Sequence, residues 1–412
     1  MDIRAEAPAS PFNAPERSPA ETTGTSPSVG LTQPIVAGIM AAFVGFAGVF
    51  TVVLQGLVAV GATQAQAASG LLAICVAQGL LSIFLSWRYR IPVSIAWSTP
   101  GSVLFAATGI IEGGFPAAVG AFILAGLLIV AAGLIKPFGR LVSSIPAVLA
   151  SAMLAGILLG LCLAPARAVG LEPALAIPVV VVWALVGRIR KIWAVPAAVA
   201  TAVALIVWTA PTGGWSIDHI TPDIAFVWPV FTLQGLVSLA IPLFIVTMAS
   251  QNLPGIAVMK ANGYEPPVGP VFFGTGVASM LVAPFGGHTL NFAALTAAMC
   301  AGPDAHPEPS RRWIASVSAG AFYLLLGLGA TLAAALVTVA PPVLIQAATG
   351  LALLGAFAGA LAGAISIPAH RDAAMVTFVT AASGLSFYGI GAAFWGLIAG
   401  GAFMLLNRNR SR

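Results

Sequence analysis

Charged residues are scarce in this chain of 412 residues. Only 7% of the residues are Asp, Glu, Lys or Arg, whereas about a quarter of an ordinary soluble domain is charged. The few charges are also unevenly spread, because neither these residue types nor His occurs between Glu21 and Arg88. The composition therefore excludes a water-soluble globular protein and indicates a chain embedded in a lipid bilayer.

Cysteine and catalytic motifs are scarce as well. Cys75, Cys162 and Cys300 each lie in an apolar run, so we expect neither a disulfide framework nor a metal site. The sequence contains no His-Glu-x-x-His or Gly-x-Ser-x-Gly motif and no carboxylate pair at membrane depth, which disfavours an enzyme and predicts no catalytic residues and no cofactor. The net charge of +5 arises from short loops between apolar runs, so nucleic acid is not an expected partner.

What the chain does contain is a series of long apolar runs. A helix needs about 20 apolar residues to cross the hydrocarbon region, and the chain after residue 30 has room for about fourteen such spans. If the N-terminus starts in the cytoplasm, every Lys and Arg except Arg167 falls on the cytoplasmic side, as the positive-inside rule requires. We therefore predict about fourteen spans with both termini cytoplasmic, preceded by a disordered cytoplasmic tail at 1–30.

The predicted spans divide into two sets. Each set has about seven spans. Because seven is an odd number, the second set starts from the opposite side of the membrane and has the opposite orientation. Such inverted repeats are typical of secondary transporters. The interval from Pro34 to Gln55 matches that from Val230 to Gln251. We expect an all-α polytopic membrane protein with inverted repeats at 31–212 and 226–408.

The third and tenth spans are predicted to be broken into a short strand and a half-helix. Residues 91–97 alternate and are rich in β-branched side chains, which favours extended chain. Ser98-Thr99-Pro100-Gly101 then supplies the hydroxyl N-cap and early Pro of a helix start. In the tenth span we expect residues 281–285 to be extended, Gly286-Gly287-His288-Thr289 to form the break, and a half-helix to run from about Leu290 to Cys300.

Two such breaks predict a binding site. Irregular backbone at membrane depth survives only where it is buried in protein or lines a cavity. Half-helices that point their N-termini inward present free N–H groups and positive dipole ends, which suit an anion. The alternative is that both breaks are kinks in continuous helices.

Two stretches resemble the benzoate:proton symporter (BenE) family. They are Arg90-Ile91-Pro92-Val93-Ser94-Ile95-Ala96-Trp97-Ser98-Thr99-Pro100-Gly101 and Pro284-Phe285-Gly286-Gly287-His288-Thr289-Leu290-Asn291, the second followed by Gly302-Pro303-Asp304-Ala305-His306-Pro307. The resemblance covers essentially the whole chain after the tail. It implies a fold like that of the uracil/xanthine and sulfate-type transporters, with core spans at 31–140 and 226–334 and gate spans at 141–212 and 335–408.

The resemblance also implies a function. A protein of this family would import benzoate or a related aromatic carboxylate with a proton across a bacterial-type inner membrane, by alternating access between core and gate. This fold often dimerises, so a homodimer is an open expectation. The alternative is a nucleobase or sulfate-type anion transporter, and a passive channel also stays open. No Asp or Glu lies at the apolar centre of a span, which favours an anion over a nucleobase.

The candidate substrate-binding residues lie at the breaks and on the spans expected beside them. They are Ser98, Thr99, Gly286 and Gly287 at the backbone breaks, Trp97, Phe285, Phe46 and Phe50 as aromatic walls, and His288, Asn291, Gln251 and Asn252 as polar contacts. His288 is placed at the start of the second half-helix and is the candidate for proton coupling, because His titrates near neutral pH. The alternative is a neutral helix cap, and the amides could equally bond between helices.

Overall fold

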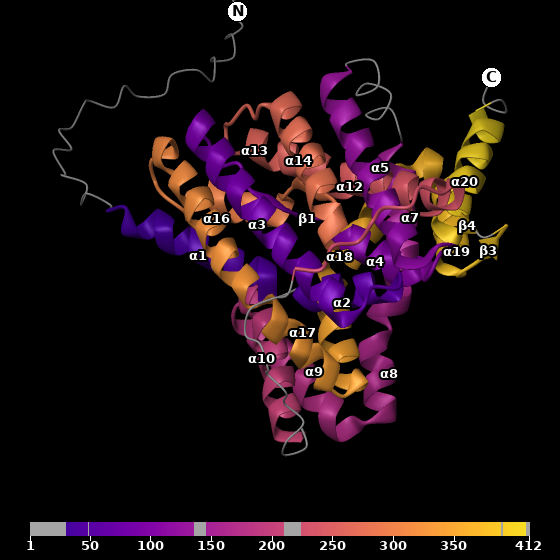
Figure 1. Ribbon diagram of the computed structural model, residues 1–412, viewed down its shortest axis with the longest axis horizontal. Helices are drawn as coiled ribbons and strands as arrows, with labels where there is room; N and C mark the ends of the chain where they lie inside the picture. The colour runs from indigo at the N-terminus through magenta and orange to yellow at the C-terminus, as the bar shows by residue number, and fades with distance from the viewer. Residues whose placement is uncertain (1–29, 48, 136–145, 210–223, 389, 409–412) are drawn as a thin grey trace, which may run out of the picture.

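The computed structural model describes residues 30–47, 49–135, 146–209, 224–388 and 390–408, and this part of the chain is mostly helical (Figure 1). In chain order the elements are α1 (Thr32–Ala47), α2 (Phe50–Ala59), α3 (Gln64–Tyr89), β1 (Ile95–Trp97), α4 (Thr99–Thr108), α5 (Gly114–Leu134), α7 (Ala147–Cys162), α8 (Ala164–Leu171), α9 (Pro173–Ile189), α10 (Lys191–Thr209), α11 (Leu233–Gly235), α12 (Ile241–Thr247), α13 (Leu253–Ala261), α14 (Val268–Val282), β2 (Leu290–Phe292), α15 (Ala294–Ala301), α16 (Trp313–Leu328), α17 (Ala330–Val339), α18 (Pro342–Ala364), α19 (Arg371–Ala382), β3 (Ser386–Phe387), β4 (Ile390–Gly391) and α20 (Ala392–Arg408). Two π-helical turns, Leu236–Ala240 and Met248–Asn252, join α11, α12 and α13 into one long helix. The predicted tail at 1–30 lies almost wholly outside the described residues.

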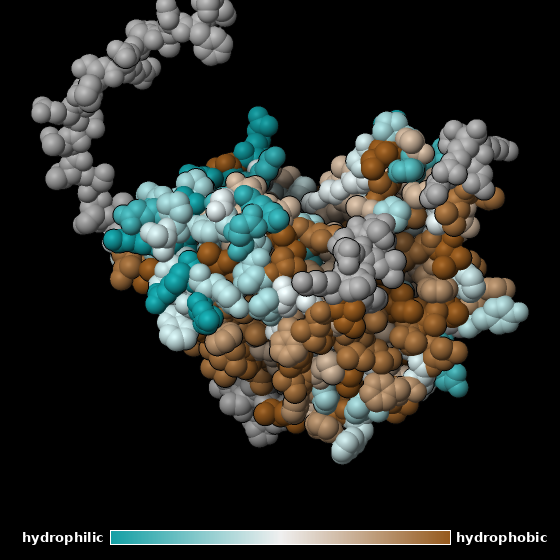
Figure 2. Space-filling model, turned by 90° about the horizontal axis from the view of Figure 1, so that it is seen from above, coloured by the Kyte–Doolittle hydropathy of each residue, from teal (hydrophilic) through white to brown (hydrophobic). Residues whose placement is uncertain are grey.

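The length and the exposed apolar side chains of the helices suit a lipid environment. Among the described residues, seven helices are long and apolar enough to cross a membrane, or eight if the pair Pro309–Leu328 and Ala330–Val337, bent by 55°, counts as one span. Large apolar side chains such as Leu80, Trp208 and Trp228 are 55% to 80% exposed, which water would penalise and lipid would not. Figure 2 shows hydrophilic residues gathered on the side of α1 and α16, with hydrophobic residues over much of the rest of that face.

Glycines bring two pairs of helices into backbone contact. A Cβ at Gly79 of α3 would lie 2.7 Å from the carbonyl oxygen of Gly320 of α16, and one at Gly126 of α5 would lie 2.9 Å from that of Gly276 of α14. Lipid tails leave no hydrophobic driving force between helices, so close packing of small residues is what holds such pairs together. These two pairs flank the centre of the structure, where the broken helices meet.

The centre is a two-stranded antiparallel ladder between β1 and β2. Ile95 pairs with Phe292, Ala96 with Asn291 and Trp97 with Leu290. After β1 the chain enters α4 where the sequence predicts, because the Ser98 side chain accepts a hydrogen bond from the Gly101 N–H and Pro100 lies in the first turn. The predicted strand and half-helix are therefore both present, as β1 and α4.

The second break differs from the prediction. Residues up to Val282 belong to α14 and Ala283–Phe285 form a 3-10 turn, so 281–285 are not extended, and the half-helix starts at Ala294 rather than at Leu290. The backbone N–H of Phe292 donates to Asn252 Oδ1 at 2.8 Å and that of Ala293 donates to the Ser94 carbonyl at 2.9 Å. These partners hold the chain extended for four residues longer than the local sequence suggests.

The loop after α15 is held by one buried arginine. Arg312, which is 7% exposed, donates to the carbonyl oxygens of Ala301, His306 and Pro307 at 2.9, 2.7 and 3.2 Å. Ala301 is the last residue of α15, so the guanidinium also complements the negative end of that helix dipole. Arg312 thereby fixes the C-terminal end of the half-helix whose N-terminal end faces the centre.

We predict that Arg312→Gln destabilises the protein. The change leaves buried carbonyls without their charged donor and should cost about 3 kcal/mol, because hydrogen bonds to charged groups are the stronger ones. The neighbouring Arg311→Gln loses only an exposed ion pair to Glu308 and should cost about 0 to 1 kcal/mol. Thermal unfolding in detergent compares the two variants, and equal losses would contradict this role for Arg312.

Candidate functional site

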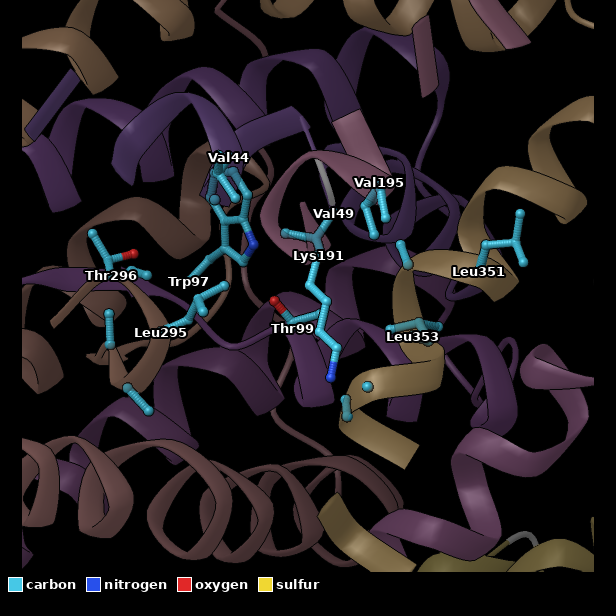
Figure 3. Close-up of a pocket in the computed structure, with 18 of the residues that line it drawn as sticks. Val44, Val49, Trp97, Thr99, Lys191, Val195, Leu295, Thr296, Leu351 and Leu353 are labelled. Carbon is cyan, nitrogen blue, oxygen red and sulfur yellow. The ribbon is translucent and has the colours of Figure 1, made fainter. Parts of the chain in front are cut away.

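A cavity of about 710 Å³ lies beside the strand crossing (Figure 3). Its lining comes from both broken spans and from helices far away in sequence. The residues are Val44, Gly45 and Val49 around the end of α1; Ala96, Trp97 and Thr99 at β1 and α4; Trp183, Ala184 and Gly187 on α9; Lys191, Ala194 and Val195 on α10; Gln251; Ala293, Ala294, Leu295 and Thr296 at the start of α15; Tyr323 on α16; and Leu351, Ala352, Leu353, Gly355 and Ala356 on α18. Most of these side chains are apolar, so the cavity suits an organic solute.

The start of α15 is the stronger source of free backbone donors in this cavity. Its N-cap is Ala293, which has no side-chain acceptor, and the first backbone bond of the helix comes from the Ala297 N–H. The N–H groups of Ala294, Leu295 and Thr296 therefore have no acceptor among the described residues. This is the positive end of a helix dipole with its donors facing a cavity.

The start of α4 contributes less. The Ser98 side chain already accepts from the third N–H of the helix, and Pro100 has no N–H. Only the backbone N–H of Thr99 is left for a ligand, together with the Thr99 hydroxyl, since Thr99 lines the cavity. The two half-helices are alike in position and unlike in the number of donors they offer.

Trp97 forms an aromatic wall that other rings support. It lines the cavity yet is only 3% exposed, and its ring lies 5.8 Å from Phe46 and 6.2 Å from Tyr323 in edge-on geometry. Phe46 in turn stacks on Phe50 at 5.4 Å. Phe46 and Phe50 therefore lie behind the wall and do not line the cavity, whereas Tyr323 does.

The structure divides the other candidate residues between the cavity and its support. Trp97, Thr99 and Gln251 line the cavity. Ser98 caps α4 and its hydroxyl lies 2.7 Å from that of Thr247, while Asn252 holds the backbone of β2. Ser98 and Asn252 are both fully buried and act on the backbone that shapes the site.

His288 lies apart from the half-helix start. It is six residues ahead of Ala294 and fully buried, so its predicted position at the N-terminus of the half-helix is wrong. Its Nε2 is 3.0 Å from the Ser102 hydroxyl of α4, and its ring packs edge-on against Phe105 and Phe122, with centroids 5.2 and 6.3 Å away. His288 therefore contacts the half-helix α4 from behind the cavity.

Phe285, Gly286 and Gly287 form a turn away from the cavity. The Phe285 carbonyl accepts a hydrogen bond from the Ser69 hydroxyl at 2.8 Å, and its ring packs on Phe226 at 5.7 Å. Gly286 has a φ of 86°, and its backbone lies against Gly70 of α3, where a side chain would clash. These residues tie the break to α3.

Unpartnered polar atoms gather beside the strand crossing. Among the described residues, Gln78 Nε2, His288 Nδ1, Thr289 Oγ1 and both amide atoms of Asn291 are buried without a hydrogen-bond partner. Gln78 is tied to the crossing, since its Oε1 accepts from the Trp97 N–H at 2.9 Å. Buried polar atoms of this kind normally bind internal water, so we expect hydration behind β1 and β2.

Sequence reasoning did not find Trp183, Lys191, Thr296 and Tyr323. Lys191 is one of the basic residues expected on the cytoplasmic side, and in the structure it is the first residue of α10 and lines the cavity. Thr296 could have been found from its place in the first turn of a half-helix, had the start of that helix been known. No local signal marks Trp183 or Tyr323, because they reach the cavity through packing of distant helices.

A helical membrane protein with two broken helices around a solute-sized cavity has the architecture expected of a membrane transporter. The chain belongs to the BenE family, described as benzoate membrane transport protein, whose sequence profile matches residues 31–406. The family is one of membrane transport proteins, so the chain is an integral membrane transporter and not an enzyme.

Individual relatives agree with this assignment. The chain is 39% identical to the inner membrane protein YdcO of Escherichia coli, over 91% of this chain and 97% of that protein. It is 31% identical to the benzoate membrane transport protein of Acinetobacter baylyi, over 89% and 92% of the two chains.

Two solved structures share the fold. The transmembrane domain of the cyanobacterial bicarbonate transporter BicA superposes with a TM-score of 0.60 at 16% identity, over 91% of this chain and 98% of that one. SLC26A9 gives a TM-score of 0.57 at 12% identity, over 92% of this chain and 66% of that one. At these identities the likeness concerns the fold alone.

Cysteine labelling tests the cavity without reference to a substrate. In a parent in which Cys75, Cys162 and Cys300 are replaced by Ala, Thr99→Cys should react with a water-soluble thiol reagent because Thr99 lines the cavity. Ser102→Cys, one turn further along α4 and fully buried, should stay unlabelled until the protein is denatured. Equal labelling of both positions in the folded protein would contradict the described cavity.

Proposed function

We propose that this protein imports benzoate or a related aromatic carboxylate together with a proton across the inner membrane. The observation that carries the proposal is the cavity, which combines free helix N–H donors with apolar and aromatic walls. A benzoate ion has the matching parts, a carboxylate and a flat apolar ring. The family and the name of the Acinetobacter baylyi relative point to the same substrate.

The carboxylate would bind at the start of α15. The N–H groups of Ala294, Leu295 and Thr296 can donate to its oxygens, and the helix dipole favours the negative charge. No Asp or Glu lines the cavity among the described residues, so nothing there repels an anion. This lining suits a carboxylate better than a nucleobase, whose N–H donors call for an acidic acceptor.

The ring would lie against Trp97 and the apolar residues around it. Aromatic pairs prefer edge-on or offset geometry, and Trp97 is fixed in place by Phe46 and Tyr323. Sulfate or bicarbonate would gain nothing from such walls. The shared fold with BicA and SLC26A9 keeps an inorganic anion as the second candidate, which the cavity lining disfavours.

The proposed mechanism is alternating access between a core and a gate, each built from spans of two inverted repeats. Up to eight spans are the long helices described above. The proposal adds six more, namely the shorter helices α9, α10, α19 and α20 and the two units β1–α4 and β2–α15, which gives fourteen. The packing supports it, because α3 on α16 has its counterpart in α14 on α5, α9 on α10 in α19 on α20, and α2 on α4 in α13 on α15. In the proposed count, each helix of one pair lies seven spans away from a helix of its counterpart pair. This correspondence is what two repeats of seven spans require.

The proposed orientation places the upper side of Figure 1 in the cytoplasm. The helix α13 and the C-terminal end of α20 lie toward that side, whereas α8 lies toward the opposite one. Lys260 is in the last turn of α13 and Arg408 ends α20, while α8 contains Arg167. A cytoplasmic upper side thus satisfies the positive-inside rule.

Proton coupling is proposed to involve His288. Its buried imidazole contacts the half-helix α4, where Nε2 is hydrogen-bonded to the Ser102 hydroxyl, and its Nδ1 has no partner among the described residues. A proton added there would turn both ring nitrogens into donors and change the contact with Ser102. His288 does not line the cavity, so it would act through α4 and through water rather than by touching the substrate.

Uptake into vesicles tests the transport proposal. Purified protein in liposomes should accumulate labelled benzoate when an inward proton gradient is imposed, and a protonophore should abolish the accumulation. Unlabelled substituted benzoates should compete, whereas excess uracil or sulfate should not. Uptake that ignores the gradient and the protonophore would refute the coupling, and competition by sulfate alone would favour the inorganic-anion alternative.

A variant of His288 tests the coupling residue. His288→Gln can still hydrogen-bond to Ser102 but does not titrate, so we expect benzoate exchange between equal pools to continue while gradient-driven accumulation falls at least about tenfold. His370→Gln, near the start of α19, serves as the control and should accumulate benzoate normally. Normal accumulation by His288→Gln would leave His288 with a structural role only.

A further inference from the structure

Lys191 is the one charged side chain among the described residues that line the cavity. It is the first residue of α10, and in Figure 3 its side chain extends through the cavity between Thr99 and Leu353. The other lining residues from α9, α10 and α18 are apolar. A cation here is therefore the dominant local charge on the side of the cavity that these helices form.

Nothing in the described chain neutralises this cation. The ion pairs found there are Lys260 with Glu265 and Arg311 with Glu308, and neither includes Lys191. No carboxylate side chain lines the cavity with it. The Lys191 side chain is exposed, so an anion that enters the cavity can reach its ammonium group and form a charge-assisted hydrogen bond with it.

Helix stability does not explain a lysine at this position. A cation at the first residue of α10 faces the positive end of that helix dipole, which is the unfavourable end. Arg188, three residues earlier, lies in the last turn of α9, where the dipole favours a cation. The positive-inside rule applies to both basic residues of this connection, but the helix dipole favours a cation at Arg188 and disfavours one at Lys191.

We propose that Lys191 is a substrate-binding residue that pairs with the carboxylate, so that the anion is held between the ammonium group of α10 and the N–H groups of α15. The inference rests on the proposed function and deepens it, because it makes the negative charge of the substrate the feature that Lys191 selects. The substrate would then bridge two helices from different parts of the bundle, one on each side of the cavity.

The test measures binding of benzoate and of its neutral analogue benzamide to the full-length protein in nanodiscs. Lys191→Gln should weaken benzoate binding at least about tenfold and leave benzamide binding unchanged, because only the charge-dependent contact is lost. Lys191→Arg should restore most of the affinity for benzoate, and Arg188→Gln, the matched control in the same connection, should bind benzoate as the wild type does.

The outcomes separate the two proposals. If the wild-type protein binds benzoate and Lys191→Gln binds it equally well, the role of Lys191 is overturned while the proposed function stands. Equal weakening toward benzoate and benzamide, or equal weakening by Arg188→Gln, would likewise overturn it. If the wild-type protein binds no benzoate, the proposed function fails and this inference fails with it.

Discussion

The structure depends on how the backbone of β1 and β2 is hydrogen-bonded at the centre of the bundle. Inside a membrane an unpaired N–H or C=O group costs several kcal/mol, so two strands of three residues survive only if every edge finds a partner. The ladder pairs the inner edges, and its ends are closed by Ser98 N–H to the Thr289 carbonyl and Ala293 N–H to the Ser94 carbonyl. The outward N–H groups of the strands donate to side chains. Ile95 donates to Ser82 and Trp97 to Gln78 of α3, Leu290 donates to Ser279 of α14, and Phe292 donates to Asn252. The Ser86 hydroxyl of α3 donates to the Val93 carbonyl just before β1.

This arrangement produces the site as a consequence. The half-helices α4 and α15 start just beyond the ladder, whose outward N–H groups are all bonded, and their first turns face a cavity rather than lipid. The N-cap residue of each half-helix decides how many backbone N–H groups of its first turn stay free to bind a ligand. Ser98 uses up one at α4, whereas Ala293 uses none at α15. The scarcity of acidic residues completes the site, since the cavity holds helix dipoles, one ammonium group and aromatic walls but no carboxylate among the described residues.

The sequence could predict those features that are encoded locally. Ser98 and Pro100 mark the start of α4 by cap and proline chemistry, and the structure confirms that start. The start of α15 was missed because Asn252 and Ser94, distant in sequence, hold residues 290–293 extended. Lys191 and Tyr323 were missed for the same reason, since only the packing of α10 and α16 brings them to the cavity.

The central claim is that free N–H groups at the start of α15 bind the carboxylate of an aromatic acid. An experimental structure with bound benzoate tests it most directly. The account predicts carboxylate oxygens about 3 Å from the backbone nitrogens of Ala294 to Thr296, with the ring against Trp97. A carboxylate held at His288, or a benzoate bound outside the cavity, would contradict the account.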